Sequence, residues 1–193
     1  MTTPSRGFAL ATSLIMLVIV TLLALAGARM AIDSRKVADN QRDRDIAFQA
    51  AEAALRDAEF DIEGGTRMTV FDANEQTGFV KGRCGTGGNA RGLCETADGE
   101  IVPIWQTVNF DDVSANAPTV AYGTFTSNRF ASGAGLLPSR PPRYIIEPMQ
   151  LTIEGASANA QGKVPFYRIT AVGFGPNPAV RVMLQTFYYK ITP

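Results

Sequence analysis

Hydrophobic and polar positions divide the first third of the chain into two consecutive helical patterns. Residues 8–28 form an apolar run without a charged side chain, FALATSLIMLVIVTLLALAGA. Residues 29–63 follow without Pro or Gly and are rich in Ala, Glu, Arg and Gln, which favour helix. Gly64 and Gly65 supply a stop signal at the carboxyl end. The pattern predicts one continuous helix over 8–63, apolar in its first half and amphipathic in its second.

A stripe of apolar residues marks one face of the second half. Its members are separated by three, four, three and four positions, and they are Phe48, Ala51, Leu55, Ala58 and Ile62. This spacing places side chains on one face of a helix. We expect this stripe to pack against the rest of the chain.

After Gly65 the sequence changes to turn residues and short alternating runs. The runs that predict strands are 101–110, 119–126, 143–153, 164–174 and 180–188. In the last of them, one face carries Val180, Val182, Leu184 and Tyr188. The segment GFGPNPA before it predicts a turn between antiparallel neighbours. One helix followed by strands predicts an α+β fold in which a sheet rests on the helical stripe.

The apolar run has the length of a membrane span. At about 1.5 Å per residue, 8–28 covers roughly 30 Å, the thickness of a bilayer's hydrocarbon core. A secretory signal peptide has a shorter apolar stretch, about 7–15 residues, followed by small residues at a cleavage site. Here Arg29 and a continuing helical pattern follow the run. We therefore expect a membrane-spanning segment that stays attached to the chain.

Composition limits the functions that the chain can have. Its 193 residues suit one modest domain plus an anchor. With 18 basic and 18 acidic residues, the chain has no basic excess that would attract nucleic acid. Histidine, the usual base near neutral pH and a common zinc ligand, is absent. The sequence therefore predicts no catalytic residues, no metal site, no cofactor and no nucleic-acid partner.

Cys84 and Cys94 are the two cysteines, and they flank the Gly-rich segment GTGGNARGL. Their spacing is not CxxC, and no further Cys or His is present to complete a zinc site. A disulfide in an oxidising compartment is favoured over two unrelated free thiols. Counting basic residues beside the apolar run would instead place the large domain on the cytoplasmic side. Composition leaves these two orientations open.

Several of these segments resemble a known family. A leader ending in Arg6 and Gly7 directly before Phe8, followed by the apolar run and a long helix, resembles a type IV prepilin. The segment AFQAAEAALRDAE, 47–59, resembles the helix signature of PilX-type minor pilins, and 167–189 resembles their carboxyl-terminal part. The resemblance implies a type IV pilin-like α+β fold, with a long amino-terminal helix packed on an antiparallel sheet. The implied parts are a leader (1–7), a transmembrane and assembly half-helix (8–28), an amphipathic half-helix (29–63) and a periplasmic sheet domain (64–193).

The resemblance also implies roles for three residues near the amino terminus. Prepilin peptidase would cut between Gly7 and Phe8, Phe8 would be N-methylated, and the domain would lie in the periplasm. Thr12 stands at the fifth mature position, where major pilins carry a Glu that pairs with the terminal amine of a neighbouring subunit. Thr12 cannot form that ion pair, which is expected of a subunit at the filament tip. Alternatively, Thr12 simply bonds back to carbonyls of its own helix.

The function implied is that of a minor pilin that helps to initiate type IV pilus assembly within a tip complex. Its partners would be the inner membrane, prepilin peptidase, the pilus assembly machinery, other minor pilins and the major pilin. A pseudopilin of a type II secretion system shares the leader and the helix. A pilus-tip adhesive module using the Cys84–Cys94 loop is a further alternative. An anchored periplasmic enzyme lacks any catalytic constellation in the sequence.

Overall fold

The computed structural model describes residues 6–71, 78–149 and 166–190. The chain divides into two units, one ending at Arg42 and the other beginning at Asp43, and each is described by itself. Most of the predicted leader, 1–5, lies outside the described residues. The same holds for the ends of two predicted strands, 150–153 and 164–165.

One helix, α1 (Arg6–Gly64), runs through both predicted helical segments without a break. No proline occurs in its 59 residues, so every turn can keep its backbone hydrogen bonds. The chain leaves the helix at Gly65, where an added Cβ would lie 2.7 Å from the carbonyl oxygen of Asp61. Only glycine fits this close turn. The prediction of one continuous helix ending at the glycine pair is confirmed.

The main sheet has four antiparallel strands in the order β3-β4-β5-β6. They are β3 (Val120–Ala121), β4 (Arg143–Met149), β5 (Phe166–Phe174) and β6 (Arg181–Tyr189). A tight turn joins β5 to β6, with the Gly175 N–H donating to the Val180 carbonyl at 2.8 Å. The predicted α+β class, the strands β4, β5 and β6 and the turn before β6 are confirmed, and side chains along β6 alternate between exposed and half-buried as expected.

Shorter elements fill the segment between α1 and β4. A parallel pair is formed by β1 (Val80–Lys81) and β2 (Cys94–Glu95). The described part of this segment also contains the short 3-10 helices η1 (Met68–Phe71), η2 (Gly88–Ala90) and η3 (Ile104–Gln106).

Two of the predicted strands are corrected by these elements. The strand expected over 101–110 is wrong, because Pro103 caps η3 and the Thr107 N–H donates to the Ile104 carbonyl at 2.8 Å. The strand expected over 119–126 is limited to β3. The chain turns directly after β3, with Gly123 at φ 80° and the Thr124 N–H donating to the Ala121 carbonyl at 3.1 Å. In both segments, local turn geometry prevails over the alternating pattern.

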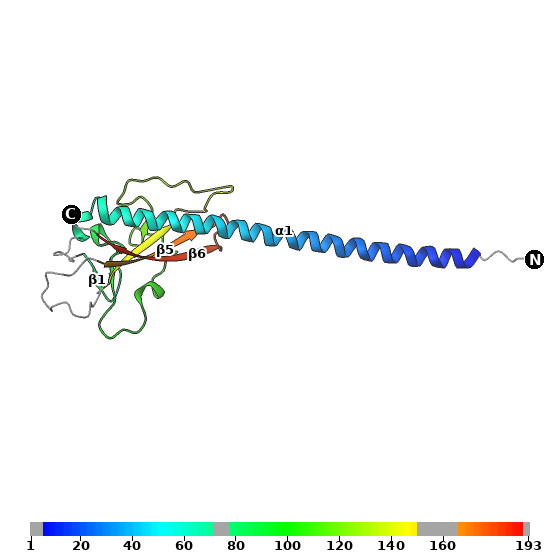
Figure 1. Ribbon diagram of the computed structural model, residues 1–193, viewed down its shortest axis with the longest axis horizontal. Coiled ribbons are helices and arrows are strands. Elements are labelled where there is room, and N and C mark those ends of the chain that lie inside the picture. Colours follow the sequence, from blue (N-terminus) through cyan, green and yellow to red (C-terminus); the bar gives the residue numbers. More distant parts are fainter. Residues whose placement is uncertain (1–5, 72–77, 150–165, 191–193) are drawn as a thin grey trace, which may run out of the picture. The chain divides into compact units, whose positions relative to one another are not determined.

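The domain part of α1 packs against one face of the sheet (Figure 1). The helix presents small side chains to this face, and those with at most 1% exposure are Ala47, Ala50, Ala51, Ala54 and Ala58. Gly173 of β5 lies directly under the helix, since a Cβ there would be 2.0 Å from the Ala47 carbonyl oxygen. The alanines and this glycine allow the helix and sheet backbones to approach closely, which increases the apolar area removed from water.

The observed stripe differs from the predicted one at its first position. Ala51, Ala58 and Ile62 are buried, and Leu55 packs against the core while remaining partly exposed. Phe48 is 43% exposed, so its assignment to the packed stripe is wrong. Residues three and four positions before Ala51 both fit a helical stripe, so Phe48 and Ala47 are each possible by spacing. In the structure the packed face continues to Ala47, and Phe48 lies outside it.

A second apolar cluster covers part of the opposite sheet face. Ile145 of β4 and Val172 and Phe174 of β5 pack there against the two cysteines and the segment around η3. The domain is therefore a three-layer arrangement of helix, sheet and loop cover around that part of the sheet. These two clusters hold both the disulfide loop and α1 on the sheet.

Candidate assembly surfaces

The apolar half of α1 presents hydrophobic side chains in all directions. Every large hydrophobic residue from Phe8 to Leu25 is exposed, at 47–73%. Within the described residues this is the one helix long and apolar enough to cross a membrane. A helix that is apolar all round needs lipid or neighbouring helices around it, because water would otherwise contact the whole surface.

The hydroxyl groups in this half are bonded within the helix itself. Thr12 donates to the Ala9 carbonyl at 3.0 Å, and Thr21 donates to the Val18 carbonyl at 2.8 Å. Ser13 makes the same kind of bond, to the Leu10 carbonyl at 2.9 Å. Satisfied hydroxyls can enter a hydrocarbon environment at low cost. The alternative considered for Thr12, a bond back to its own helix, is what the structure contains.

Gly7 and Phe8 both lie in the first turns of α1. The Phe8 side chain is exposed. Cleavage between these two residues, methylation of Phe8 and the tip role inferred from Thr12 stay predictions.

The disulfide between Cys84 and Cys94 is confirmed. Both cysteines are buried in the cluster on the outer sheet face, whereas the loop tip around η2 is exposed. Backbone bonds close the loop further, with the Gly85 N–H donating to the Leu93 carbonyl at 3.0 Å. In the chain-entropy model, closing a loop this short contributes about 2–3 kcal/mol. The disulfide fixes the base of the loop and leaves its tip accessible to solvent.

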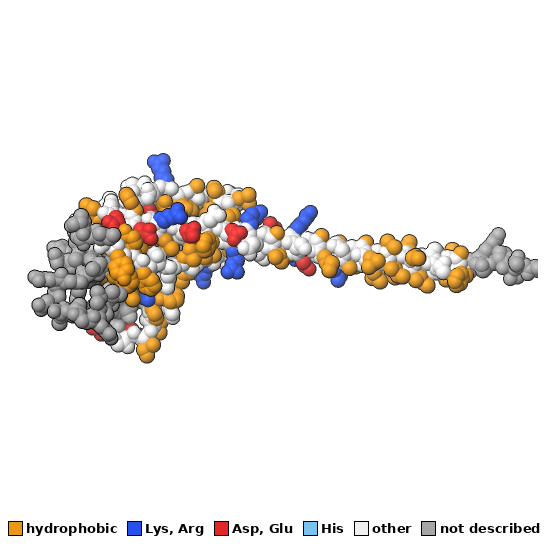
Figure 2. All heavy atoms as spheres, viewed as in Figure 1, with side chains coloured by type: hydrophobic (Ala, Val, Ile, Leu, Met, Phe, Trp, Pro, Cys, Tyr) orange, Lys and Arg blue, Asp and Glu red, His pale blue; other side chains and the backbone are white. Residues whose placement is uncertain are grey.

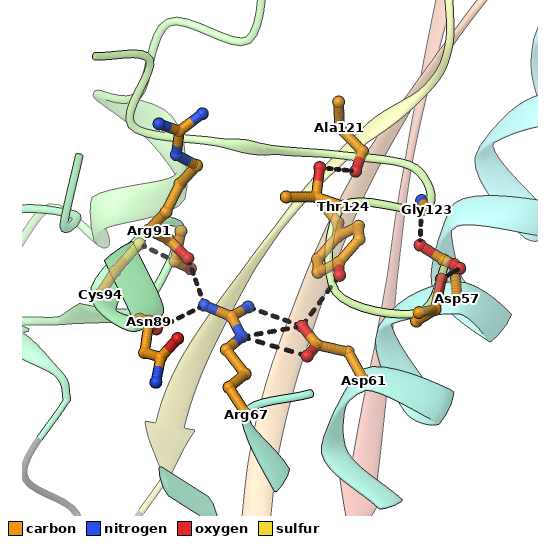
Figure 3. Close-up of polar contacts among 12 residues, drawn as sticks. Asp57, Asp61, Arg67, Asn89, Arg91, Cys94, Ala121, Gly123 and Thr124 are labelled. Carbon is orange, nitrogen blue, oxygen red and sulfur yellow. Dashed lines mark hydrogen bonds and ion pairs between the residues drawn. The ribbon is translucent and has the colours of Figure 1, made fainter. Parts of the chain in front are cut away.

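A buried ion pair that the sequence reading missed connects α1 to this loop. Asp61 of α1 and Arg67, in the turn that follows the helix, both have side chains that are 0% exposed, with a shortest N–O distance of 2.6 Å. The remaining guanidinium nitrogen donates to the carbonyls of Asn89 at 2.7 Å and Arg91 at 2.6 Å, both in the disulfide loop (Figure 3). Arg67 therefore holds the end of the helix and the stapled loop together.

Aromatic side chains complete the surroundings of this pair. The Tyr144 hydroxyl of β4 donates to Asp61 at 2.9 Å, and the Arg67 guanidinium lies 3.7 Å from the centre of the Phe125 ring. Burial raises the pKa of Tyr144 well above its ordinary value, and the Asp61 carboxylate acts in the same direction. The tyrosine therefore remains a hydrogen-bond donor at any physiological pH.

Asp57, one turn earlier on α1, binds the segment after β3 through hydrogen bonds. Its carboxylate accepts hydrogen bonds from the Gly123 N–H at 2.7 Å and from the Asn128 side chain at 3.0 Å, as well as from the Thr126 hydroxyl. The side chain of Asp57 is buried, so these donors replace the water that the carboxylate loses.

Helical spacing could have identified both aspartates as side chains on the packed face of α1. Asp57 and Asp61 each lie three residues after a buried alanine, Ala54 and Ala58, so both fall on or beside the packed face of α1. A carboxylate in that position requires buried donors. The identity of those donors depends on residues more than 60 positions away for Asp57, which no local pattern reveals.

The described residues contain no group of three or more His, Cys, Asp or Glu side chains that could hold a metal ion. The segment 131–140 is largely exposed. Exposed surfaces of the described residues include the apolar half of α1, the disulfide loop tip and this segment.

Comparison with protein families gives two matches along the chain. The model for the PilX N-terminal region matches residues 6–56. The model for the C-terminal region of type IV pilus assembly protein PilX matches residues 82–190, more than half of the chain. No curated protein and no solved structure matches the chain.

Proposed function

This chain belongs to the PilX family of type IV pilus assembly proteins, a structural and non-enzymatic family, and we propose that it acts as a minor pilin. The family and the apolar amino-terminal helix associate the chain with the membrane and the pilus. The observation that carries the proposal is the exposed apolar half of α1, which continues without a break into the half that packs on the sheet. Such a helix can move from lipid into a bundle of similar helices without refolding.

In this proposal the chain first lies in the inner membrane, with residues 64–193 in the periplasm. The Cys84–Cys94 disulfide supports this orientation, because disulfides persist in oxidising compartments. Prepilin peptidase cuts after Gly7, and Phe8 becomes the methylated amino terminus. The apolar half of α1 then packs against other minor pilins and the major pilin. Small side chains that allow close approach of these helices are Ala9, Ala11, Ser13 and Ala24.

The position proposed for this subunit is the tip of the filament, where it helps to initiate assembly. Thr12 carries no charge, so it cannot supply the carboxylate that would form an ion pair with the terminal amine of a preceding subunit, and its hydroxyl donates to its own helix. A subunit at the tip has no preceding subunit to contact. The membership in a pilus assembly family favours this role over that of a type II secretion pseudopilin.

Blocking the leader cleavage tests the proposal. In Gly7→Val, we expect the full leader to remain attached and the chain to be absent from sheared pili, because the branched side chain occupies the cleavage position. The measurement is the intact mass of the chain from the membrane fraction and its amount in the pilus fraction. Gly87→Val is the matched control, since Gly87 lies in the sheet domain, outside the apolar half of α1, and a Cβ there meets nothing within 4 Å beyond its chain neighbours.

The control is expected to give the mature mass and normal pilus association. A Gly7→Val chain with the mature mass would contradict processing at this site. A correctly processed wild-type chain that never appears with pili would contradict the role as a pilus subunit.

A further inference from the structure

The outer edge of β6 is long and open. β6 ends the four-stranded sheet, and within 6–71, 78–149 and 166–190 no strand pairs with its outer side. Its nine residues, RVMLQTFYY, contain no Pro, Gly or Lys, and they pair with β5 in an unbroken register. Native proteins usually protect such an edge with Pro, a lysine or a bulge, because its free N–H and C=O groups bind other strands. β6 has no Pro, Lys or bulge, and its single charged residue, Arg181, stands at its first position and pairs with Asp111.

On the sheet face away from α1, β6 presents three apolar side chains together with Arg181 and Gln185. Met183, Phe187 and Tyr189 are 43%, 56% and 45% exposed. Phe166 of β5 joins Phe187 and Tyr189, with ring centres 5.5 Å and 4.4 Å apart. The three aromatic residues, together with Met183 on the other side of Gln185, are called here the edge patch. A strand placed next to β6 would bury the edge patch with its own alternate side chains.

The side of β6 toward α1 has a different character. The Tyr188 hydroxyl donates to Glu63 of α1 at 2.8 Å. Burial, this hydrogen bond and the charges of Glu63 and Glu59 raise the pKa of Tyr188 to about 12. Acidic side chains are spaced along the domain part of α1 beside hydrophobic side chains on the face shown in Figure 2. Near Tyr188, the helix-facing side of the edge therefore lies beside the carboxylates of Glu59 and Glu63, and Lys and Arg side chains are also spaced along α1 in Figure 2.

We propose that the edge of β6 binds an extended segment of another pilus subunit, which adds to this sheet as a further strand. The segment carries apolar residues at alternate positions that pack on the edge patch, and a basic residue that faces Glu59 and Glu63. Main-chain hydrogen bonds supply affinity in this mode of recognition, and alternate side chains supply specificity. The inference rests on the proposed role as a pilus subunit and names the surface through which the sheet domain contacts its neighbour.

Photo-crosslinking in piliated cells tests this contact in the full chain. Phe187 is replaced by p-benzoylphenylalanine, which preserves an aromatic ring at an exposed position. Val113, an exposed apolar residue outside the edge patch, receives the same replacement as the matched control. We expect irradiation to give one defined adduct from position 187, at least tenfold more abundant than any adduct from position 113. The attached peptide should come from another pilus subunit and have alternating apolar residues and a basic residue.

Hydrogen exchange of the isolated adduct distinguishes strand addition from contact through side chains alone. Amides of β6 that face away from β5 should exchange about tenfold or more slowly in the adduct than in the free chain, because a new strand accepts their hydrogen bonds. Unchanged exchange along β6 would overturn strand addition. Equal adduct yields at positions 187 and 113, or no adduct at 187, would overturn the edge as the contact.

A separate variant keeps this inference distinguishable from the proposed function. In Phe187→Lys, we expect normal leader removal but at least a tenfold loss of the adduct formed by a probe at Met183. If the leader is removed and the adduct is unchanged, binding at the β6 edge is contradicted, whereas the proposed role as a minor pilin is not. A chain that is neither processed nor associated with pili would overturn both.

Discussion

Replacing Arg67 with Met is expected to lower the free energy of unfolding of the sheet domain by about 3–5 kcal/mol. Arg67 is the buried cation that neutralises Asp61, and it also donates to two carbonyls of the disulfide loop. Met fills a similar volume but leaves the Asp61 carboxylate buried without a countercharge. The Asn89 and Arg91 carbonyls lose their donor in the same step. The loss therefore affects the helix end and the loop together.

Denaturant unfolding of the full chain in detergent measures this effect, with the fluorescence of the single tryptophan, Trp105, as the probe. Lys81→Met is the matched control, because Lys81 and Asp98 form an exposed, solvent-screened pair that is expected to contribute little to the free energy of unfolding. Adding Asp61→Asn to Arg67→Met should recover part of the loss, because the double variant has no buried charge. An Arg67→Met chain as stable as wild type would show that the pair does not hold the domain together.

Gly173→Ala is expected to destabilise the same domain by about 3 kcal/mol, the upper part of the usual range for overpacking. The new Cβ would lie 2.0 Å from the Ala47 carbonyl oxygen and 2.4 Å from the Ala51 amide nitrogen. Both are backbone atoms of α1, so no side chain can rotate away to make room. The helix must separate from the sheet, and the alanine-lined contact loses its close packing.

The same unfolding measurement applies, with Gly87→Ala as the control. A Cβ at Gly87 meets nothing within 4 Å, and substitutions at such surface sites usually change stability by at most about 0.5 kcal/mol. Equal stability of the two variants would mean that the backbones of α1 and β5 are not in close contact at Gly173. A selective loss at Gly173 would support the close helix–sheet contact as a major element of the domain's stability.

The long helix and the last three strands could be predicted because their signals are local and repeated. An apolar run, a three–four periodicity and the absence of Pro together specify α1 over 59 residues. Strict alternation specifies β6, and the Gly- and Pro-rich turn before it fixes the antiparallel pairing with β5. The disulfide followed from the presence of two cysteines without other metal ligands.

The remaining structure depends on contacts that have no local signature. The segment around Ile104 alternates like a strand, but Pro103 begins a 3-10 turn there. Phe48 satisfies the helical spacing and is nevertheless exposed, because the packed face follows the alanines and not the largest side chain. Arg67 stands in a turn, where an arginine is normally solvated. Its burial is decided by Asp61 and by a loop more than 20 residues further on.

The site residues divide in the same way. Gly7, Phe8 and Thr12 could be proposed because the leader and the apolar run resemble those of a type IV prepilin. The edge patch could not be proposed, because it requires knowing that β6 is the last strand of the sheet and that Phe166 stands beside it. Strand order is a property of the whole fold and not of any one segment.

The central claim is that the apolar half of α1 is retained in the mature protein and joins it to neighbouring subunits. Mass spectrometry of the amino-terminal peptide of wild-type chain recovered from sheared pili tests this claim most directly. The account predicts a mature chain that begins at N-methylated Phe8. A mature chain that begins beyond Ala28 would contradict it, because the segment needed for membrane insertion and helix packing would have been removed.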